Sequence, residues 1–234
     1  SSDLVLDTLR FTLEEQETEV VTDCAVEKII VSQKGRDTEF LVRAGGEDWL
    51  FRKLILACGS IAGEKNADFG GYALAKALGH TILKPLPALV QLRCAGSFWK
   101  GLAGVRCDAR IQLLISGPGT KESYEEQGEL QLTDYGISGI PVFQLSRFAA
   151  AALDAGRQVK ASIDFLPGFR DNEALWQELM EEKCTSCRQR SMEVLFGGLV
   201  NKKIIQTAVK LCGLSMGDRA ERKNLPAIRR VFAL

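Results

Sequence analysis

Residues 54–63, Leu-Ile-Leu-Ala-Cys-Gly-Ser-Ile-Ala-Gly, and residues 67–80, Ala-Asp-Phe-Gly-Gly-Tyr-Ala-Leu-Ala-Lys-Ala-Leu-Gly-His, decide the predicted fold. The apolar run from Phe51 to Cys58 predicts a short strand buried on both faces, as in a parallel sheet. The glycines that follow permit turns and a close approach of the backbone to a ligand. Residues 72–78 have helical spacing, and Gly79 with His80 ends the helix. This order of elements is typical of the nucleotide-facing edge of an α/β domain.

The composition is that of an ordinary globular protein and argues against several functions. The 234 residues are enough for one large domain or for two to three small ones. Lys and Arg number 30, as do Asp and Glu, so no overall charge attracts nucleic acid or an anionic membrane. No apolar run approaches the ~20 residues that span a bilayer, and we find no signal-peptide pattern. We therefore expect no nucleic-acid or membrane partner.

The seven cysteines predict reduced thiols in a cytoplasmic protein. Their number is odd and several lie in apolar runs, which does not suit a disulfide framework. Cys184 and Cys187 form the only close pair, within a helical pattern. A zinc site would need two further ligands at matching spacing, and the single histidine, His80, is far away in sequence. We therefore expect an ordinary pair of helical cysteines and no metal site.

Three compositional blocks follow one another, with boundaries near residues 82 and 168. The first block, 1–82, begins with an amphipathic helix that reaches Leu13 and continues with strands. The block 83–168 has short strands and glycine-rich turns, which predict a small barrel or folded sheet. The block 169–234 reads as a bundle of amphipathic helices. The predicted fold class is thus α+β (mixed): part of an α/β nucleotide-binding domain, a β-barrel-like insertion and a helical subdomain.

The individual elements follow from the periodicity of apolar residues and from turn signals. Strands are expected at 19–22, 25–32, 39–44, 49–52, 88–93, 105–115, 128–132 and 159–165. Residues 117–127 are expected to form a hairpin excursion. Helices are expected at 143–153, 171–184, 188–199, 202–211 and 227–234, with Asp171 or Asn172 capping the second of these.

Common catalytic and phosphate-binding motifs are missing from the sequence. There is no GxGxxG after a strand and no GxxxxGK[ST], and residues 101–104 read as a turn. No GxSxG elbow is present, and His80 is better explained as a helix cap than as a catalytic base. No pair of carboxylates stands out from the charged helix faces. A complete hydrolase is therefore disfavoured, and a dinucleotide would lack its pyrophosphate loop here.

Residues 128–147 form a second unusual stretch, Gly-Glu-Leu-Gln-Leu-Thr-Asp-Tyr-Gly-Ile-Ser-Gly-Ile-Pro-Val-Phe-Gln-Leu-Ser-Arg. Gly136 and Gly139 frame a tight loop, and Pro141 opens a helix whose N-terminus could face an anion or a cofactor edge. A glycine-rich connection between a strand and a helix, without any ligand, explains the same residues. Both interpretations stay open on the residues alone.

Both stretches resemble a bacterial flavoprotein family, the aminoacetone-oxidase-like NAD(P)/FAD-dependent oxidoreductases. Residues 54–60 with 69–82 are similar to that family's "ATGG … GDGY-ELAKKLGH" segment. Residues 85–90, Pro-Leu-Pro-Ala-Leu-Val, are similar to its "P-x-PALVPL" element, and residues 132–141 to its "FTHFGLSGPAIL" element. The resemblance covers residues 1–165. The sequence departs from the family at Cys58, Ser60 and residues 67–70, where a Thr, a Gly and a Ser/Thr-Gly-rich loop are usual.

The resemblance implies a layout that accounts for the missing glycines. In the family, an N-terminal Rossmann unit carries GxGxxG and a C-terminal segment completes the flavin site. A barrel-like insertion and a helical subdomain lie between them. We accordingly expect this chain to be a middle fragment, with the other segments of the parent flavoprotein as its partners.

The resemblance implies an FAD-dependent oxidoreductase that passes hydride or electrons between a small-molecule substrate, or NAD(P)H, and the flavin. Whether the isolated fragment is an enzyme stays open, and we expect it to bind FAD weakly or not at all. The flavin is expected near Ala57, Cys58, Gly59, Ser60, Gly70, Gly71 and Tyr72. Gly136, Ser138 and Gly139 would approach the flavin or substrate side. No catalytic side chain is assigned, since the isoalloxazine carries such chemistry.

The alternative is a non-enzymatic binding module, in which the barrel and the helical bundle form a docking surface. The parent reading frame distinguishes the two. A GxGxxG upstream supports the enzyme, whereas a stop codon or an unrelated domain supports the module.

Overall fold

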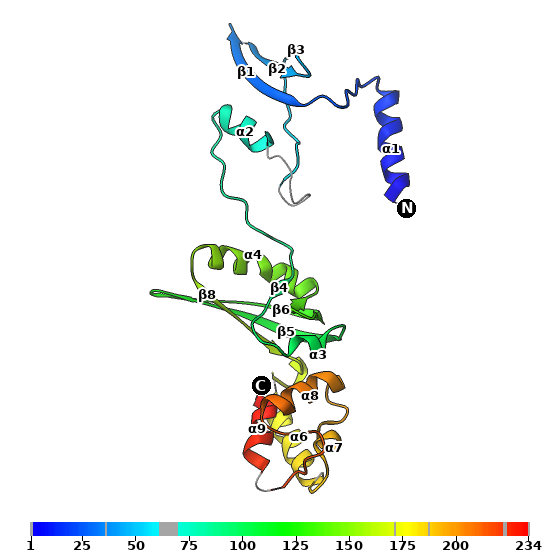
Figure 1. Ribbon diagram of the computed structural model, residues 1–234, viewed down its shortest axis with the longest axis vertical. Coiled ribbons are helices and arrows are strands. Elements are labelled where there is room, and N and C mark those ends of the chain that lie inside the picture. Colours follow the sequence, from blue (N-terminus) through cyan, green and yellow to red (C-terminus); the bar gives the residue numbers. More distant parts are fainter. Residues whose placement is uncertain are drawn as a thin grey trace. The chain divides into compact units, whose positions relative to one another are not determined.

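The computed structural model describes residues 2–35, 37–60, 70–170, 172–186, 188–221 and 224–233. The chain forms two compact units, Ser1–Pro85 and Leu86–Leu234. Helices and an open, barrel-like sheet are both present (Figure 1), which confirms the predicted α+β class. No helix in these described ranges is long and apolar enough to cross a membrane.

The unit Ser1–Pro85 holds a small antiparallel sheet. Strand β1 (Val26–Lys34) pairs with β2 (Asp37–Ala44), and β2 pairs with β3 (Glu47–Phe51). The helices are α1 (Ser2–Glu15) and α2 (Gly70–Ala77). Their core is small: Ile29, Val42 and Ala44 are buried, and Cys24, Phe40, Trp49, Leu54, Leu74 and Leu78 pack against them. The predicted strand at 19–22 is absent, since those residues belong to the irregular connection from α1 to β1.

The predicted buried strand from Phe51 to Cys58 is wrong for this structure. Strand β3 ends at Phe51, and residues 54–60 carry no strand assignment. Ile55 is 89% exposed and Leu56 is 37% exposed. An apolar strand of this kind needs neighbouring strands and covered faces. The described residues of this unit provide only the antiparallel sheet β1-β2-β3, so the segment has no ladder to join.

The unit Leu86–Leu234 contains a five-stranded antiparallel sheet in the order β4-β7-β6-β5-β8. The strands are β4 (Leu92–Arg93), β5 (Arg106–Gly117), β6 (Thr120–Leu132), β7 (Gly136–Ser138) and β8 (Gln158–Asp164). Strands β5 and β6 form one long hairpin in which Gly117 pairs with Thr120. The predicted excursion at 117–127 is therefore a regular part of this hairpin, and the predicted strand at 88–93 shortens to β4.

Helix α4 (Ile140–Asp154) packs along one face of this sheet (Figure 1). Its buried residues Val142, Leu145, Ala149 and Ala152 meet alternate residues of the strands, because successive side chains of a strand point to opposite faces. The strand residues in this core are Ala109, Ile111, Leu113, Ile115, Leu130, Leu132 and Ile137. Helix α3 (Trp99–Leu102) adds Trp99 and Leu102 to the same core.

The rest of the unit is helical, as predicted. It consists of α5 (Pro167–Arg170), α6 (Glu173–Ser186), α7 (Met192–Phe196), α8 (Lys202–Leu211) and α9 (Leu225–Ala233). Its second core is formed by Met192, Leu195, Phe196, Ile205, Val209, Ala220 and Ile228. Ile204 of α8 belongs to the core of the sheet, and Lys203 Nζ donates to the carbonyl oxygen of Ala103 at 3.2 Å. Helix α8 thus joins the bundle to the sheet.

Candidate functional site

The first candidate stretch brings Cys58 and Gly71 together. Residues 57–60 are exposed, and Gly70 and Gly71 open helix α2. A Cβ placed on Gly71 would lie 2.8 Å from the Cβ of Cys58, so only glycine fits against this cysteine. Cys58 is an exposed free thiol. Ser60 and Tyr72 each have an interaction partner of their own.

Two glycines beside this contact have free space around them among the described residues. Gly59 has a φ of +74°, and a Cβ placed there or on Gly70 would meet no atom of the described residues within 4 Å. Helix α2 begins at Gly70, so its first amide groups form the positive end of the helix dipole. An open glycine backbone beside a helix N-terminus fits the edge of a flavin or a phosphate group. Residues 61–69, which include part of this predicted loop, lie outside the described residues.

The second candidate stretch lies within the sheet of the other unit. A Cβ on Gly136 would collide with the carbonyl oxygen of Leu92, and a Cβ on Gly139 with that of Glu129. Both glycines have positive φ angles, 154° and 108°. Ser138 is only 4% exposed and is paired with Gln131 in the ladder. Close packing of neighbouring strands therefore accounts for both glycines, as the interpretation without a ligand expects.

The turn before Gly136 holds polar groups that sequence reasoning did not single out. The amide of Thr133 donates to the carbonyl oxygen of Gly136 at 2.9 Å, and Cys94 N donates to Tyr135 O at 2.9 Å. The Arg93 guanidinium lies 5.0 Å from the centre of the Tyr135 ring. Thr133 Oγ1 is buried without a hydrogen-bond partner. Burial raises the pKa of the Cys94 thiol, which keeps it protonated and unreactive.

A polar cluster joins the hairpin to β8. Arg157 Nη2 donates to Glu122 Oε1 at 2.6 Å, and Tyr124 Oη donates to Glu122 Oε2 at 2.9 Å. These two hydrogen bonds, from Arg157 first, lower the pKa of the Glu122 carboxyl. The Tyr124 ring stacks on Phe148 of α4 with centroids 3.8 Å apart. The cluster ties the β5–β6 hairpin to the start of β8. Arg157 and Glu122 are 35 residues apart, so no local sequence pattern could predict their contact.

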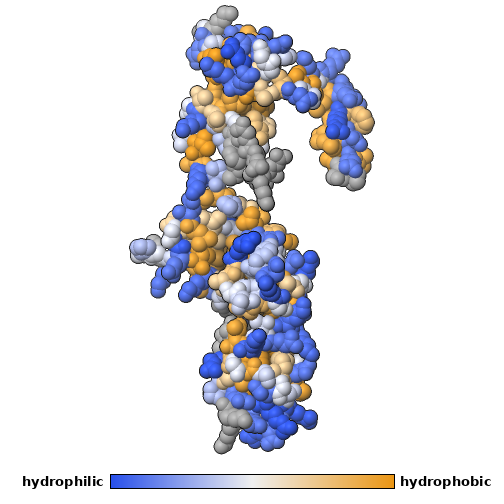
Figure 2. All heavy atoms as spheres, in the orientation of Figure 1, coloured by the Kyte–Doolittle hydropathy of each residue, from blue (hydrophilic) through white to orange (hydrophobic). Residues whose placement is uncertain are grey.

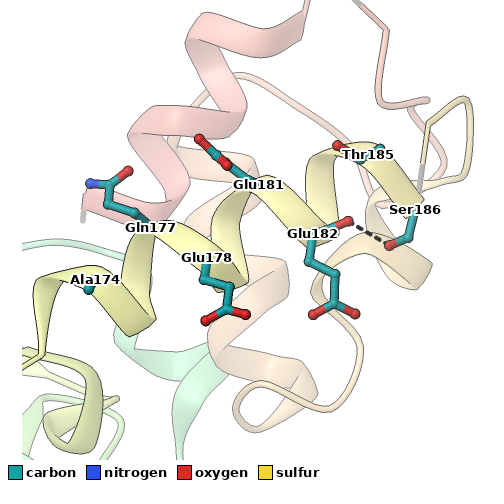
Figure 3. A pocket seen from close by; sticks show the side chains of 7 residues that line it. All are labelled: Ala174, Gln177, Glu178, Glu181, Glu182, Thr185 and Ser186. Carbon is teal, nitrogen blue, oxygen red and sulfur yellow. Dashed lines mark hydrogen bonds between the residues drawn. The ribbon is translucent and has the colours of Figure 1, made fainter.

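An open depression of about 620 Å³ lies along α6, and the described residues that line it all belong to that helix. Figure 3 shows the side chains of Glu178 and Glu182 on one side of α6, and that of Glu181 on the other. Among the described residues, no group of three or more histidine, cysteine or acidic side chains could hold a metal ion. Cys187 lies outside the described residues, so the interpretation of Cys184 and Cys187 as an ordinary pair of helical cysteines stays a prediction.

Comparison with known proteins agrees with this architecture. Residues 86–228 match the family model described as "HI0933-like protein barrel and H2TH domain". The chain is also similar to the 3-dehydro-bile acid delta(4,6)-reductase of Clostridium scindens, with 35% identity over 224 residues. The match includes 95% of this chain and 51% of the reductase, so the chain spans about half the length of this relative. The five-stranded sheet and the helical bundle lie within or largely within the matched residues, and the chain belongs to the HI0933-like barrel and H2TH family.

Proposed function

We propose that this chain is part of an FAD-dependent oxidoreductase that reduces a small-molecule substrate. The observations that carry the proposal are the match of residues 86–228 to the HI0933-like family and the 35% identity to a reductase over 95% of this chain. The similarity to a protein named as a reductase supports the direction of the reaction. Residues 54–60 and 69–82 resemble flavoprotein segments, which supports FAD as the cofactor.

The residues proposed to hold FAD are Ala57, Cys58, Gly59, Ser60, Gly70, Gly71 and Tyr72. Their backbone would give a flat, uncharged approach to the cofactor, since side chains are small or absent at most of these positions. Bound FAD would supply the hydride or electron transfer, and NAD(P)H is proposed as its source of electrons. Gly136, Ser138 and Gly139 are proposed to lie on the flavin or substrate side for their role in the resemblance alone, since strand packing already accounts for both glycines.

The test uses the longest protein that the reading frame of this chain encodes. We expect it to purify yellow and to show the visible absorbance of bound flavin. Gly59→Val should lower flavin affinity by about tenfold or more, which corresponds to about 1.4 kcal/mol, because its side chain fills the open space. Gly46→Val is the matched control: Gly46 also has a positive φ, +83°, and open surroundings.

A colourless protein whose reading frame carries no GxGxxG would refute the proposal and favour the binding module. Equal flavin loss in both variants would show that Gly59 acts only through the fold. The first substrate to assay is a 3-dehydro bile acid, because the relative is named as a reductase of such an acid.

A further inference from the structure

Helix α6 buries none of the side chains that the structure describes on it. They are all exposed or half-buried, and the buried residues of the bundle core lie elsewhere, mainly on α7, α8 and α9. On one side of α6, Trp176 meets Phe169 edge to face, and Lys183 Nζ donates to the carbonyl oxygen of Gly197 at 3.3 Å. The opposite side carries the open depression, where no other described element lies against the helix. A helix of 14 residues is marginal in water by itself, so a partner on this open side would stabilise it.

The open side of α6 is acidic. Glu178, Glu181 and Glu182 line the depression, and Figure 3 shows Glu178 and Glu182 pointing to the same side. Like charges at positions i and i+4 destabilise a helix. Within the described ranges, none of these three carboxylates has an ion pair or a hydrogen bond. Cationic side chains from outside would therefore stabilise α6.

Three arginines lie just beyond the end of α6 and are called here the arginine group: Arg188, Arg190 and Arg219. Ser191 forms a β-bridge with Arg219, and the amide of Ala220 donates to the carbonyl oxygen of Arg190 at 2.9 Å, so two segments meet here. All three arginines are exposed, and none has an ion pair within the part of the chain that the structure describes. Figure 2 shows hydrophilic residues over much of the visible surface of this bundle. An acidic face and a basic group, both without a described counterion, thus follow one another along α6.

We propose that the open side of α6 and the arginine group form an interface between two copies of this chain. From Glu178 to the end of α6 at Ser186 the helix rises about 12 Å, so the two charged regions lie one after the other along its axis. When two copies of α6 lie antiparallel about a two-fold axis, the glutamates of each copy face the arginine group of the other. Each contact is then made twice.

The same observations argue against other occupants of this face. A small molecule is normally enclosed by several elements, whereas the described lining of the depression belongs to α6 alone. A nucleic acid or an anionic membrane would be repelled by the three glutamates beside the arginine group. A second copy neutralises both regions at once. The interface lies outside the proposed flavin site, so its test does not depend on bound flavin.

The experiment measures the dimer dissociation constant of the longest protein that the reading frame encodes, by sedimentation velocity. It compares about 0.1 M with about 1 M salt, where the Debye length is about 10 Å and about 3 Å. We expect a dimer whose dissociation constant rises at least about tenfold at the higher salt concentration. Glu182→Lys and Arg190→Glu should each have a similar effect at the lower one, since each places like charges opposite one another twice. Glu126→Lys is the matched control, because it makes the same change of charge at an exposed position of β6.

Mixing the two variants separates a lost contact from a damaged fold. In a mixed dimer of Glu182→Lys with Arg190→Glu, one contact is the wild-type pair and the other is the same pair with its charges exchanged. The equimolar mixture should therefore regain the wild-type dissociation constant. The inference is overturned if the wild-type protein is monomeric, if its dimer is insensitive to salt, if the mixture binds no more tightly than the separate variants, or if Glu126→Lys weakens the dimer equally.

Discussion

At position 136, close packing against the backbone of a neighbouring strand requires glycine. A side chain there would meet the carbonyl oxygen of Leu92 on the neighbouring strand, in addition to the cost of a positive φ. We expect Gly136→Ala to lower the free energy of unfolding by more than about 3 kcal/mol, measured by urea denaturation. Gly156→Ala is the control, since Gly156 has a φ of +69° but open surroundings, and should cost only about 1–2 kcal/mol. Equal losses would contradict the packing explanation.

Glu122 should make the stability of the unit Leu86–Leu234 depend on pH. Its hydrogen bonds from Arg157 and Tyr124 lower its pKa below the ordinary value of 4.5. A carboxyl with a lowered pKa stabilises the fold above that ordinary value, and the stabilisation is lost as the pH falls below it. The melting temperature of the wild-type chain should therefore drop more steeply below about pH 4.5 than that of Glu122→Gln.

The matched control for this comparison is Glu126→Gln, on the same strand and exposed. It should retain the wild-type pH profile. If Glu122→Gln and wild type fall in parallel, the ion pair with Arg157 makes no net contribution in solution, as is common for exposed pairs.

At the scale of elements, α8 depends on a side-chain cap at its start. Asn201 Oδ1 accepts a hydrogen bond from the Lys203 amide at 3.0 Å. Asn201→Ala should cost about 1 kcal/mol of stability, whereas Gln206→Ala, in the exposed middle of the same helix, should change it by less than about 0.5 kcal/mol. Thermal unfolding of the chain measures both. Because α8 contributes Ile204 to the sheet core, Asn201→Ala should also lower the stability of β5 and β6.

Elements with a local signal were predictable from the sequence, and those that depend on distant partners were not. The periodicity of α1 and α8 and the alternation in β1, β2 and β5 predict them at nearly their observed bounds. Residues 54–58 carry the correct pattern for a buried strand but no described neighbours to pair with. Strand β6 was predicted too short, because its first half is rich in charged residues and looks like a loop.

The candidate site was less predictable than the fold. Sequence reasoning selected the glycines at 70–71 and 136–139, but it could not distinguish a glycine that faces a ligand from one that faces a neighbouring strand. The structure gives Gly71 and Gly136 protein neighbours, and it places no described residue against a Cβ at Gly59 or Gly70. Contacts such as Arg157 with Glu122 join positions 35 residues apart, for which a single sequence offers no signal.

At the scale of the whole molecule, the two units differ greatly in the size of their cores. Among the described residues, three buried hydrophobic residues form the centre of Ser1–Pro85, whereas the sheet core of Leu86–Leu234 has fifteen. Small cores open more readily. We expect the amides of β1 and β2 to exchange with deuterium much faster than those of β5 and β6, as read by mass spectrometry. Equal protection of both sheets would contradict this.

Strand β7 pairs with β6 only at Gln131 and Leu132. The described part of the sheet therefore leaves the outer edge of β6 from Thr120 to about Gln127 without a ladder partner. Such an edge invites pairing with other chains, and natural proteins block it with charged side chains. Lys121, Glu122, Glu125 and Glu126 stand along this strand. The same charged side chains that made β6 look like a loop in the sequence are therefore expected to oppose the pairing of this edge with other chains.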